Sequence, residues 1–202
     1  LSLNAQIGKD PAGVQVVKTK HSISIAGKVI NYTATTGYMH MKADTGKVLA
    51  KIFFTYYSKD DEDGVKRPVT FTFNGGPGSA SLWLHMGGVG PKRVVLKDDG
   101  TATAAPYSYI PNEFSWLDKT DLVFIDPVST GYSRAVGESA SKYHGYVEDI
   151  KSVGDFVRNF LSRYDRWASP KFLAGESYGT TRAAGLSKFL QDEHRIYING
   201  VI

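Results

Sequence analysis

A serine between two glycines, in the pentapeptide G-E-S-Y-G at 175–179, is the residue best placed for covalent chemistry. Ser177 follows a short apolar segment predicted as a strand, and a helical pattern begins at Thr180. A serine at a sharp strand-to-helix turn is typical of a nucleophile elbow, in which flanking glycines let the two elements approach each other. Chance alone gives roughly 0.2 such strings in a chain of this composition. The prediction therefore depends on the position of the string at the junction.

A second glycine-rich run, N-G-G-P-G at 74–78, ends a predicted strand of β-branched and aromatic residues at 68–73. Its chance expectation is about three in ten thousand. Backbone N–H groups in a loop without Cβ atoms can point at the oxyanion of a tetrahedral intermediate, together with the N–H that follows a nucleophilic serine. A plain strand-ending turn is the alternative. Phosphate binding is disfavoured, because no Lys-Ser or Lys-Thr pair follows and no G-x-G-x-x-G occurs.

The elements that must position these loops begin with strands. Alternating polar and apolar residues predict strands at 21–25 and 29–41, and a strand rich in aromatic residues follows at 48–57. Together they predict an antiparallel meander over residues 18–58. Residues 1–17 show little periodicity and are expected to form an irregular arm.

The chain beyond residue 120 alternates between strands and helices. Buried strands are predicted at 122–125, at 171–174 and from residue 196, and apolar residues at helical spacing predict helices at 147–161 and 180–191. Alternation of this kind is typical of an α/β fold with parallel strands. The predicted sheet is mixed and mostly parallel, with the antiparallel meander at one edge.

The composition is that of a globular domain, with 42% hydrophobic and 22% charged residues in a chain of 202. The net charge of +4 comes from scattered residues, so nucleic-acid binding is not expected. No apolar run approaches the roughly 18 residues of a membrane span. The absence of cysteine excludes disulfides and thiolate nucleophiles. The acidic run at 60–64 is interpreted as a solvated loop and not as a metal site.

Three motifs together resemble those of the serine carboxypeptidases, which are α/β-hydrolases. The run N-G-G-P-G-S-A-S at 74–81 is similar to the family's N-G-G-P-G-C-S-S, and G-E-S-Y at 175–178 is similar to the sequence around its nucleophile. The third motif lies at 112–133, where Ser115-Trp116 and P-V-S-T-G-Y-S resemble the family's N-x-x-S-W and P-V-G-x-G-F-S. The motifs occur in the family's order and extend over about half the chain.

The resemblance implies a serine-type carboxypeptidase that removes C-terminal residues from peptides through an acyl-enzyme, with no metal and no cofactor. Ser177 matches the nucleophile, and Gly76 and Tyr178 match the positions whose backbone N–H groups form the oxyanion hole. The positions that bind the substrate's terminal carboxylate are matched by Asn74, Gly75 and Glu176. An acid that shares a proton with that carboxylate would favour acidic pH, since two facing carboxyl groups do not both ionise cheaply.

Two departures from the family pattern affect these expectations. Ser79 replaces the usual cysteine, so the disulfide built from that cysteine is absent. The glutamate usually found before the L-G-P turn has no counterpart in G-G-V-G-P at 87–91. This second departure leaves strict carboxypeptidase specificity and the acidic optimum open.

The catalytic acid and base of this fold follow the nucleophile in the order Asp, then His. After Ser177 the chain offers only Asp192 and His194, both at the end of the predicted helix, and neither is assigned to the triad. The remaining histidines are expected to be structural or surface residues: His21, His40, His85 and His144. Residues 1–202 are therefore expected to be the N-terminal portion of one α/β-hydrolase domain, incomplete at its C-terminus and inactive alone. The expected partner is the C-terminal remainder of the same protein, which would carry the triad Asp and His.

Other functions remain open at this stage. A proline iminopeptidase also carries G-G-P-G, but it has a histidine at the position of Asn74 and a tryptophan at that of Tyr178. Acyl transfer by an enzyme of the same fold is another alternative. The alternative that is not an enzyme is a catalytically silent binding module with the hydrolase fold. The family resemblance favours a secreted or periplasmic protein, without membrane association.

Overall fold

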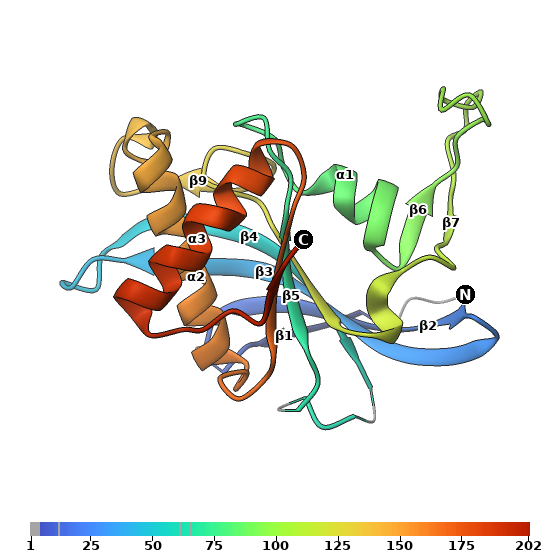
Figure 1. Cartoon of the computed structure of the whole chain (residues 1–202), viewed down its shortest axis with the longest axis horizontal. Coiled ribbons are helices and arrows are strands. Elements are labelled where there is room, and N and C mark those ends of the chain that lie inside the picture. The colour runs from blue at the N-terminus through green and yellow to red at the C-terminus, as the bar shows by residue number, and fades with distance from the viewer. Residues whose placement is uncertain (1–4, 12, 61, 65) are drawn as a thin grey trace.

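A single nine-stranded sheet runs through the part of the chain that the structure, a computed structural model, describes: residues 5–11, 13–60, 62–64 and 66–202 (Figure 1). Its spatial order is β1-β2-β3-β4-β8-β5-β10-β11, and β9 pairs with β4. The strands are β1 (Ala5–Lys9), β2 (Gln15–Ile25), β3 (Lys28–Lys42), β4 (Val48–Lys59), β5 (Val69–Phe73), β8 (Asp121–Ile125), β9 (Arg134–Ala135), β10 (Lys171–Gly175) and β11 (Gly200–Val201).

The antiparallel edge of the sheet confirms the predicted meander and extends it. Strands β2, β3 and β4 pair in long antiparallel registers, from Ile23↔Ile30 in one hairpin to Met39↔Ile52 in the next. The expected irregular arm is wrong for the described residues of β1 and for the start of β2, because Ala5 pairs with Thr19 and Lys9 with Gln15. Every residue of β1 is exposed, so the strand has no buried face and leaves no apolar alternation in the sequence.

The parallel part of the sheet confirms the predicted α/β-hydrolase architecture. Strands β8, β5, β10 and β11 run parallel, and β5 and β8 are buried along their whole length. The antiparallel share of the sheet is larger than expected, since β4 also joins β8 in antiparallel register. Because parallel strands present their carboxyl ends at one edge, the loops after β5, β8 and β10 meet there.

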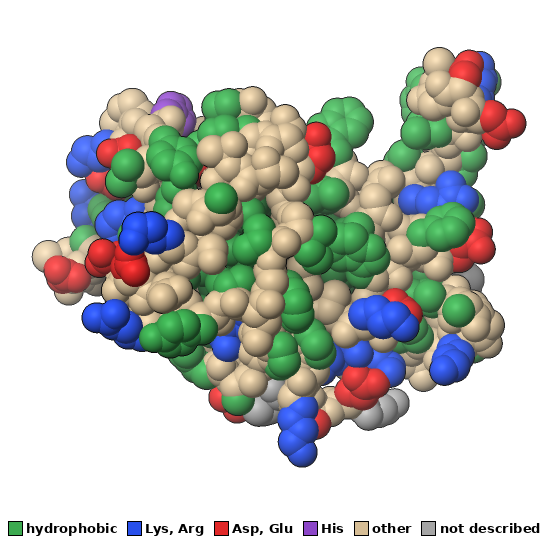
Figure 2. All heavy atoms as spheres, viewed as in Figure 1, with side chains coloured by type: hydrophobic (Ala, Val, Ile, Leu, Met, Phe, Trp, Pro, Cys, Tyr) green, Lys and Arg blue, Asp and Glu red, His purple; other side chains and the backbone are tan. Residues whose placement is uncertain are grey.

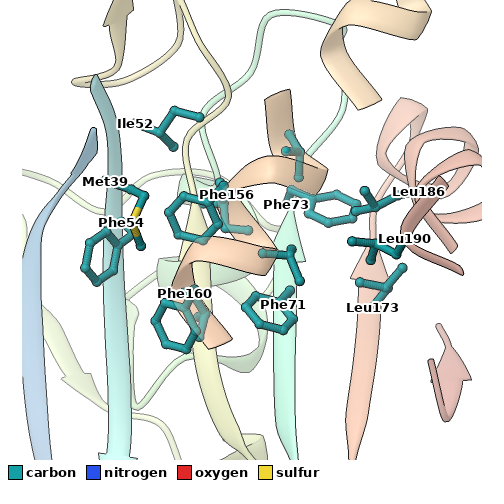
Figure 3. Packing of buried hydrophobic residues seen from close by; sticks show 14 of the residues in the cluster. Met39, Ile52, Phe54, Phe71, Phe73, Phe156, Phe160, Leu173, Leu186 and Leu190 are labelled. Atoms are coloured by element: carbon teal, nitrogen blue, oxygen red, sulfur yellow. The ribbon is translucent and has the colours of Figure 1, made fainter. Parts of the chain in front are cut away.

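Two helices, α2 (Tyr146–Arg163) and α3 (Tyr178–His194), pack on one face of the sheet. Figure 3 shows the rings of this core lying between strands and α2, with leucines of β10 and α3 beside them. Phe54 packs edge-on against Phe156 and Phe160, with ring centroids 5.7 and 6.0 Å apart. The helix predicted at 147–161 is confirmed, and the one predicted from 180 begins two residues earlier.

The opposite face is covered by short helical turns and a hairpin. Helix α1 (Leu82–Leu84) continues into a π-helical turn at His85–Val89, and a 3₁₀ turn lies at Trp116–Asp118. Strands β6 (Lys92–Val94) and β7 (Tyr109–Pro111) form an arm that projects from the body (Figure 1). In the view of Figure 2, apolar side chains gather in the middle of the face and charged ones toward its margins. No helix in the described residues is long and apolar enough to cross a membrane.

Candidate active site

Ser177 occupies the turn between β10 and α3, and its side chain is exposed to solvent. Its backbone angles, φ 57° and ψ −126°, lie in a region that residues with a side chain rarely adopt. The turn is held by backbone bonds on both sides: Glu176 N–H donates to the Phe73 carbonyl at 3.3 Å, and Gly179 N–H donates to the Glu176 carbonyl at 2.8 Å. A strained strand-to-helix backbone of this kind is the geometry expected of a nucleophile elbow.

Glycines are required where the loop after β5 meets this turn. A Cβ on Gly75 would lie 2.8 Å from both the Glu176 carbonyl oxygen and the Gly179 nitrogen. A Cβ on Gly179 would lie 2.6 Å from the Phe73 carbonyl oxygen, and one on Gly175 would overlap the Gly179 carbonyl group. The two motifs found in the sequence are therefore packed backbone against backbone, with no room for side chains between them.

Asn74 joins the two motifs through its side chain. It is completely buried directly after β5, and its Nδ2 donates to Glu176 Oε2 at 3.0 Å. Its Oδ1 accepts from the Leu84 N–H at the same distance, so α1 fixes the orientation of the amide. One Nδ2 hydrogen is left without a partner among the described residues. Asn74 and the exposed Glu176 thus offer an amide donor and a carboxyl group next to Ser177.

The backbone N–H groups at this edge that have no hydrogen-bond partner among the described residues include those of Gly76 and Tyr178. Tyr178 is the first residue of α3, where a helix leaves its N–H groups free, and Gly76 has the positive φ of 106° that suits glycine. Both belong to segments that Gly75 brings into backbone contact. Free donors here, beside an exposed hydroxyl, are able to stabilise an oxyanion.

A buried ion pair under the elbow was not found by sequence reasoning. Arg182 of α3 is 1% exposed, and its Nε donates to Asp149 Oδ2 at 2.8 Å. Its Nη1 donates to the Asn74 backbone carbonyl at 2.7 Å. The guanidinium also lies over the ring of Tyr178, 5.1 Å from its centroid, and the Tyr178 hydroxyl donates to Asp149 at 3.4 Å.

The sequence did contain a signal for this pair. Asp149 stands four and seven positions before Val153 and Phe156, and Arg182 stands four positions before Leu186. Charged residues in the apolar stripe of a helix are buried, and buried charges need partners. On that ground both positions could have been predicted to be buried and to need a partner, although the spacing does not say which partner.

Asp126, directly after β8, is a third acidic residue at the carboxyl edge that the sequence analysis left without a role. Its Oδ1 accepts the Ser81 N–H at 2.9 Å, which ties the loop after β5 to β8. Burial raises the pKa of this carboxyl group above its usual range. A Cβ on Gly131 would overlap the Asp126 carboxyl group, so glycine is needed there.

Neither polar residue at the end of α3 reaches Ser177. The helix begins at Tyr178 and ends at His194, so a rise of 1.5 Å per residue puts Asp192 and His194 about 21 and 24 Å along the axis from its first residue. His194 Nε2 lies 3.0 Å from Asp155 of α2, and Asp192 pairs with Lys188. Leaving both out of the triad is consistent with this placement.

The histidines that precede Ser177 lie in several parts of the fold, and none is hydrogen-bonded to Ser177 within the described residues. His85 is stacked on Phe124 and lies 2.6 Å from the Tyr57 hydroxyl, and burial lowers its pKa to about 4. His144 lies 3.0 Å from the Ser129 hydroxyl, while His21 and His40 stand on the meander strands. No hydrogen bond to the Ser177 hydroxyl and no cluster of three metal-binding side chains occurs among the described residues.

Comparison with known proteins places these motifs in a single family. A sequence profile of the family described as serine carboxypeptidase matches residues 25–200. Serine carboxypeptidase-like 33 of Arabidopsis thaliana is 26% identical over 164 residues, which are 80% of this chain and 32% of that protein. The pheromone-processing carboxypeptidase KEX1 of Saccharomyces cerevisiae is 35% identical over 135 residues, which are 62% of this chain and 17% of that protein.

The chain therefore spans a third or less of the length of these relatives. Among solved structures, vibralactone cyclase is similar with a TM-score of 0.48 and 13% identity, over 84% of this chain and 41% of that one. An esterase of Pyrobaculum calidifontis has a TM-score of 0.45 and 16% identity, over 82% and 43% of the two chains.

Proposed function

The chain belongs to the serine carboxypeptidase family, and from this premise we propose that the complete protein is a serine-type peptidase that removes C-terminal residues from peptides. The observation that carries the proposal is the backbone of Ser177, held at φ 57° beside the unpartnered N–H groups of Gly76 and Tyr178. Strain of this kind costs about 1–3 kcal/mol and persists where the surrounding structure imposes it. An exposed hydroxyl on a strained turn near two free donors supports a nucleophilic role for Ser177.

The reaction proceeds through an acyl-enzyme. Ser177 Oγ attacks the carbonyl carbon of the last peptide bond, and its proton passes to a histidine base. The N–H groups of Gly76 and Tyr178 donate to the oxyanion that forms. The base then protonates the leaving amine, and water releases the acyl group in a second step.

The base and its aspartate come from the remainder of the protein after residue 202, which is the partner this domain requires. The Ser177 hydroxyl has no hydrogen-bonded base among the described residues. Without a base a serine hydroxyl is a poor nucleophile, and loss of the triad typically costs about a millionfold in kcat. Residues 1–202 alone are therefore expected to be inactive.

The substrate's terminal carboxylate is held by Asn74, Gly75 and Glu176. Asn74 supplies the free Nδ2 hydrogen, its amide fixed by Glu176 and Leu84, and Gly75 supplies a backbone N–H. Glu176 shares a proton with the incoming carboxylate, because two adjacent carboxyl groups do not both ionise cheaply. Residues 87–91 lack the family's additional glutamate. Glu176 therefore acts without a second glutamate beside it.

Hydrolysis of a matched pair of peptides tests this proposal in the complete protein. The two peptides share one sequence and differ only in a free or amidated C-terminus. Amidation should lower kcat/KM at least tenfold, because a lost hydrogen bond to a charged group is worth about 1.5–3 kcal/mol. The Glu176→Gln variant should narrow the difference between the two peptides. Equal rates on acid and amide would overturn the carboxypeptidase assignment.

A proline iminopeptidase is the second candidate, because an exposed carboxylate such as that of Glu176 is also able to hold a substrate ammonium group. A third peptide, acetylated at its N-terminus, separates the two. A carboxypeptidase cleaves it at an unchanged rate, whereas an enzyme that binds the free amine does not. A secreted or periplasmic location remains a prediction from the family.

A further inference from the structure

Arg182 contacts both halves of the candidate oxyanion hole. One half is the loop that begins at Asn74, whose backbone carbonyl accepts from Arg182 Nη1 at 2.7 Å. The other half is the start of α3, where the guanidinium covers the ring of Tyr178 at 5.1 Å. The guanidinium also lies over the ring of Phe73, the last residue of β5, 5.3 Å from its centroid.

Asp149, in the first turn of α2, fixes the orientation of this guanidinium. Its Oδ2 accepts from Arg182 Nε at 2.8 Å and its Oδ1 from Nη2 at 3.3 Å, so the contact is bidentate. Its Oδ2 is also 3.4 Å from the Tyr178 hydroxyl. A planar guanidinium that is bound by both oxygens of a carboxylate has a fixed orientation. A lysine ammonium in its place does not reproduce these contacts.

We propose that the Arg182–Asp149 pair is the positioning unit of the oxyanion hole: it sets the Gly76 and Tyr178 N–H groups relative to each other. The inference rests on the proposed function, because it assumes that these N–H groups receive the oxyanion. Neither residue touches the substrate. Arg182 acts through the Asn74 carbonyl and the Tyr178 ring, and Asp149 acts through Arg182.

The placement of the pair predicts a specific kinetic effect. An oxyanion hole contributes to the transition state and not to the bound substrate, so a displaced donor lowers kcat and leaves KM nearly unchanged. Misplacement of reacting groups by about 1 Å costs about a hundredfold. A variant that only destabilises the fold would instead lower the amount of active protein.

The chain offers a matched control for burial and charge. Arg166 is 2% exposed and donates to Asp121 at 2.6 Å, but it lies at the amino ends of the same parallel strands. The experiment compares Arg182→Lys with Arg166→Lys in the complete protein, and adds Asp149→Asn, which removes the charge and keeps the shape. Each variant is measured for thermal unfolding, for kcat and KM, and for inhibition by a peptide boronic acid that forms an adduct with Ser177.

Arg182→Lys and Asp149→Asn should lower kcat by about 10- to 100-fold with KM within about twofold of wild type. Affinity for the boronic acid should fall by a similar factor, while affinity for the free product peptide stays unchanged. Arg166→Lys should destabilise the fold and leave kcat per folded molecule unchanged. The inference is overturned if Arg182→Lys keeps the wild-type kcat, or if both lysine variants lower it equally.

A second measurement separates this inference from the proposed function. In protein labelled with ¹⁵N, Arg182→Lys should displace the amide resonances of both Gly76 and Tyr178, and Arg166→Lys should displace neither. If the wild-type protein hydrolyses no peptide, the proposed function fails. The amide resonances alone then test whether Arg182 and Asp149 position the N–H groups of Gly76 and Tyr178. Unchanged resonances at either residue in Arg182→Lys would contradict the positioning role.

Discussion

The two ends of the parallel strands both bury arginine–carboxylate pairs, and they use them differently. At the amino ends, Asp121 accepts from Arg67 at 2.7 Å and from Arg166 at 2.6 Å, and all three side chains are almost fully buried. The remaining donors of Arg166 are taken up as well. Ser169 and the Arg67 carbonyl accept at 2.7 Å each, the Tyr56 hydroxyl accepts at 2.6 Å and the Pro68 carbonyl at 3.3 Å. Within the described residues, the donors of this network are therefore satisfied by the protein itself.

The carboxyl ends carry the buried pair of Arg182 and Asp149, but the neighbouring groups in the loops after β5 and β10 are exposed or unpartnered. Ser177 and Glu176 are exposed, and the N–H groups of Gly76 and Tyr178 are unpartnered within the described chain. The same type of buried ion pair therefore completes one end of the sheet and holds the other end in a strained, unsatisfied state. A satisfied network contributes to stability and specificity, whereas strained and unpaired groups are typical of functional sites.

The largest effect is expected at the amino end of the parallel strands. Asp121→Asn removes the carboxylate that two buried guanidinium groups share, and breaking a buried pair in this way costs about 3–5 kcal/mol. Urea denaturation should report that loss in the free energy of unfolding, while kcat per folded molecule stays at the wild-type level. A fall in kcat without a loss of stability would show that this end is not merely structural.

At the carboxyl ends of the strands, one added methyl group should do the reverse and lower the activity more than the stability. Gly75→Ala puts a Cβ against the elbow backbone, so the loop or the turn must move. We expect at least a hundredfold loss of kcat/KM, equivalent to about 2.7 kcal/mol of transition-state stabilisation. Gly8→Ala is the control, because a Cβ there meets open space on β1. Wild-type activity in Gly75→Ala would mean that the two motifs need not touch.

Relief of the backbone strain at Ser177 should have a smaller effect and should raise the free energy of unfolding. Ser177→Gly and Ser177→Ala both remove the hydroxyl, but only glycine relieves the positive φ. The glycine variant should therefore be the more stable of the two by about 1 kcal/mol, measured by urea denaturation. Equal stability would indicate that the turn relaxes in the absence of the hydroxyl, and that its strain is not imposed by the glycine contacts.

The parts of the molecule that could be predicted from the sequence are local ones. The elbow depends on a strand, a turn and a helix that are contiguous. The parallel strands β5 and β8 are recognisable because both of their faces are buried, and most of β10 is buried as well. Strand β1 escaped prediction because it is exposed throughout and forms only by pairing with β2. The projecting hairpin of β6 and β7 also leaves no strong pattern in the sequence.

The contacts that join distant segments could not be read from spacing. Asn74 and Glu176 were brought together only by the family resemblance, and the structure places them 3.0 Å apart across 102 positions. Arg182 and Asp149 stood in apolar stripes, but their choice of each other depends on how α2 and α3 pack on the sheet. Asp121 was assigned to no network, because Arg67 and Arg166 lie 54 and 45 positions away.

The most direct test of the site at the carboxyl ends is covalent labelling of the complete protein with a fluorophosphonate, followed by peptide mapping. Only a serine activated by a base attacks such a probe at an appreciable rate. Ser177 should carry a single label in the wild-type protein and in Arg166→Lys, and Ser177→Ala should carry none. Labelling that persists in Ser177→Ala, or a label on another serine of the wild-type protein, would contradict the assignment of the carboxyl edge as the reactive site.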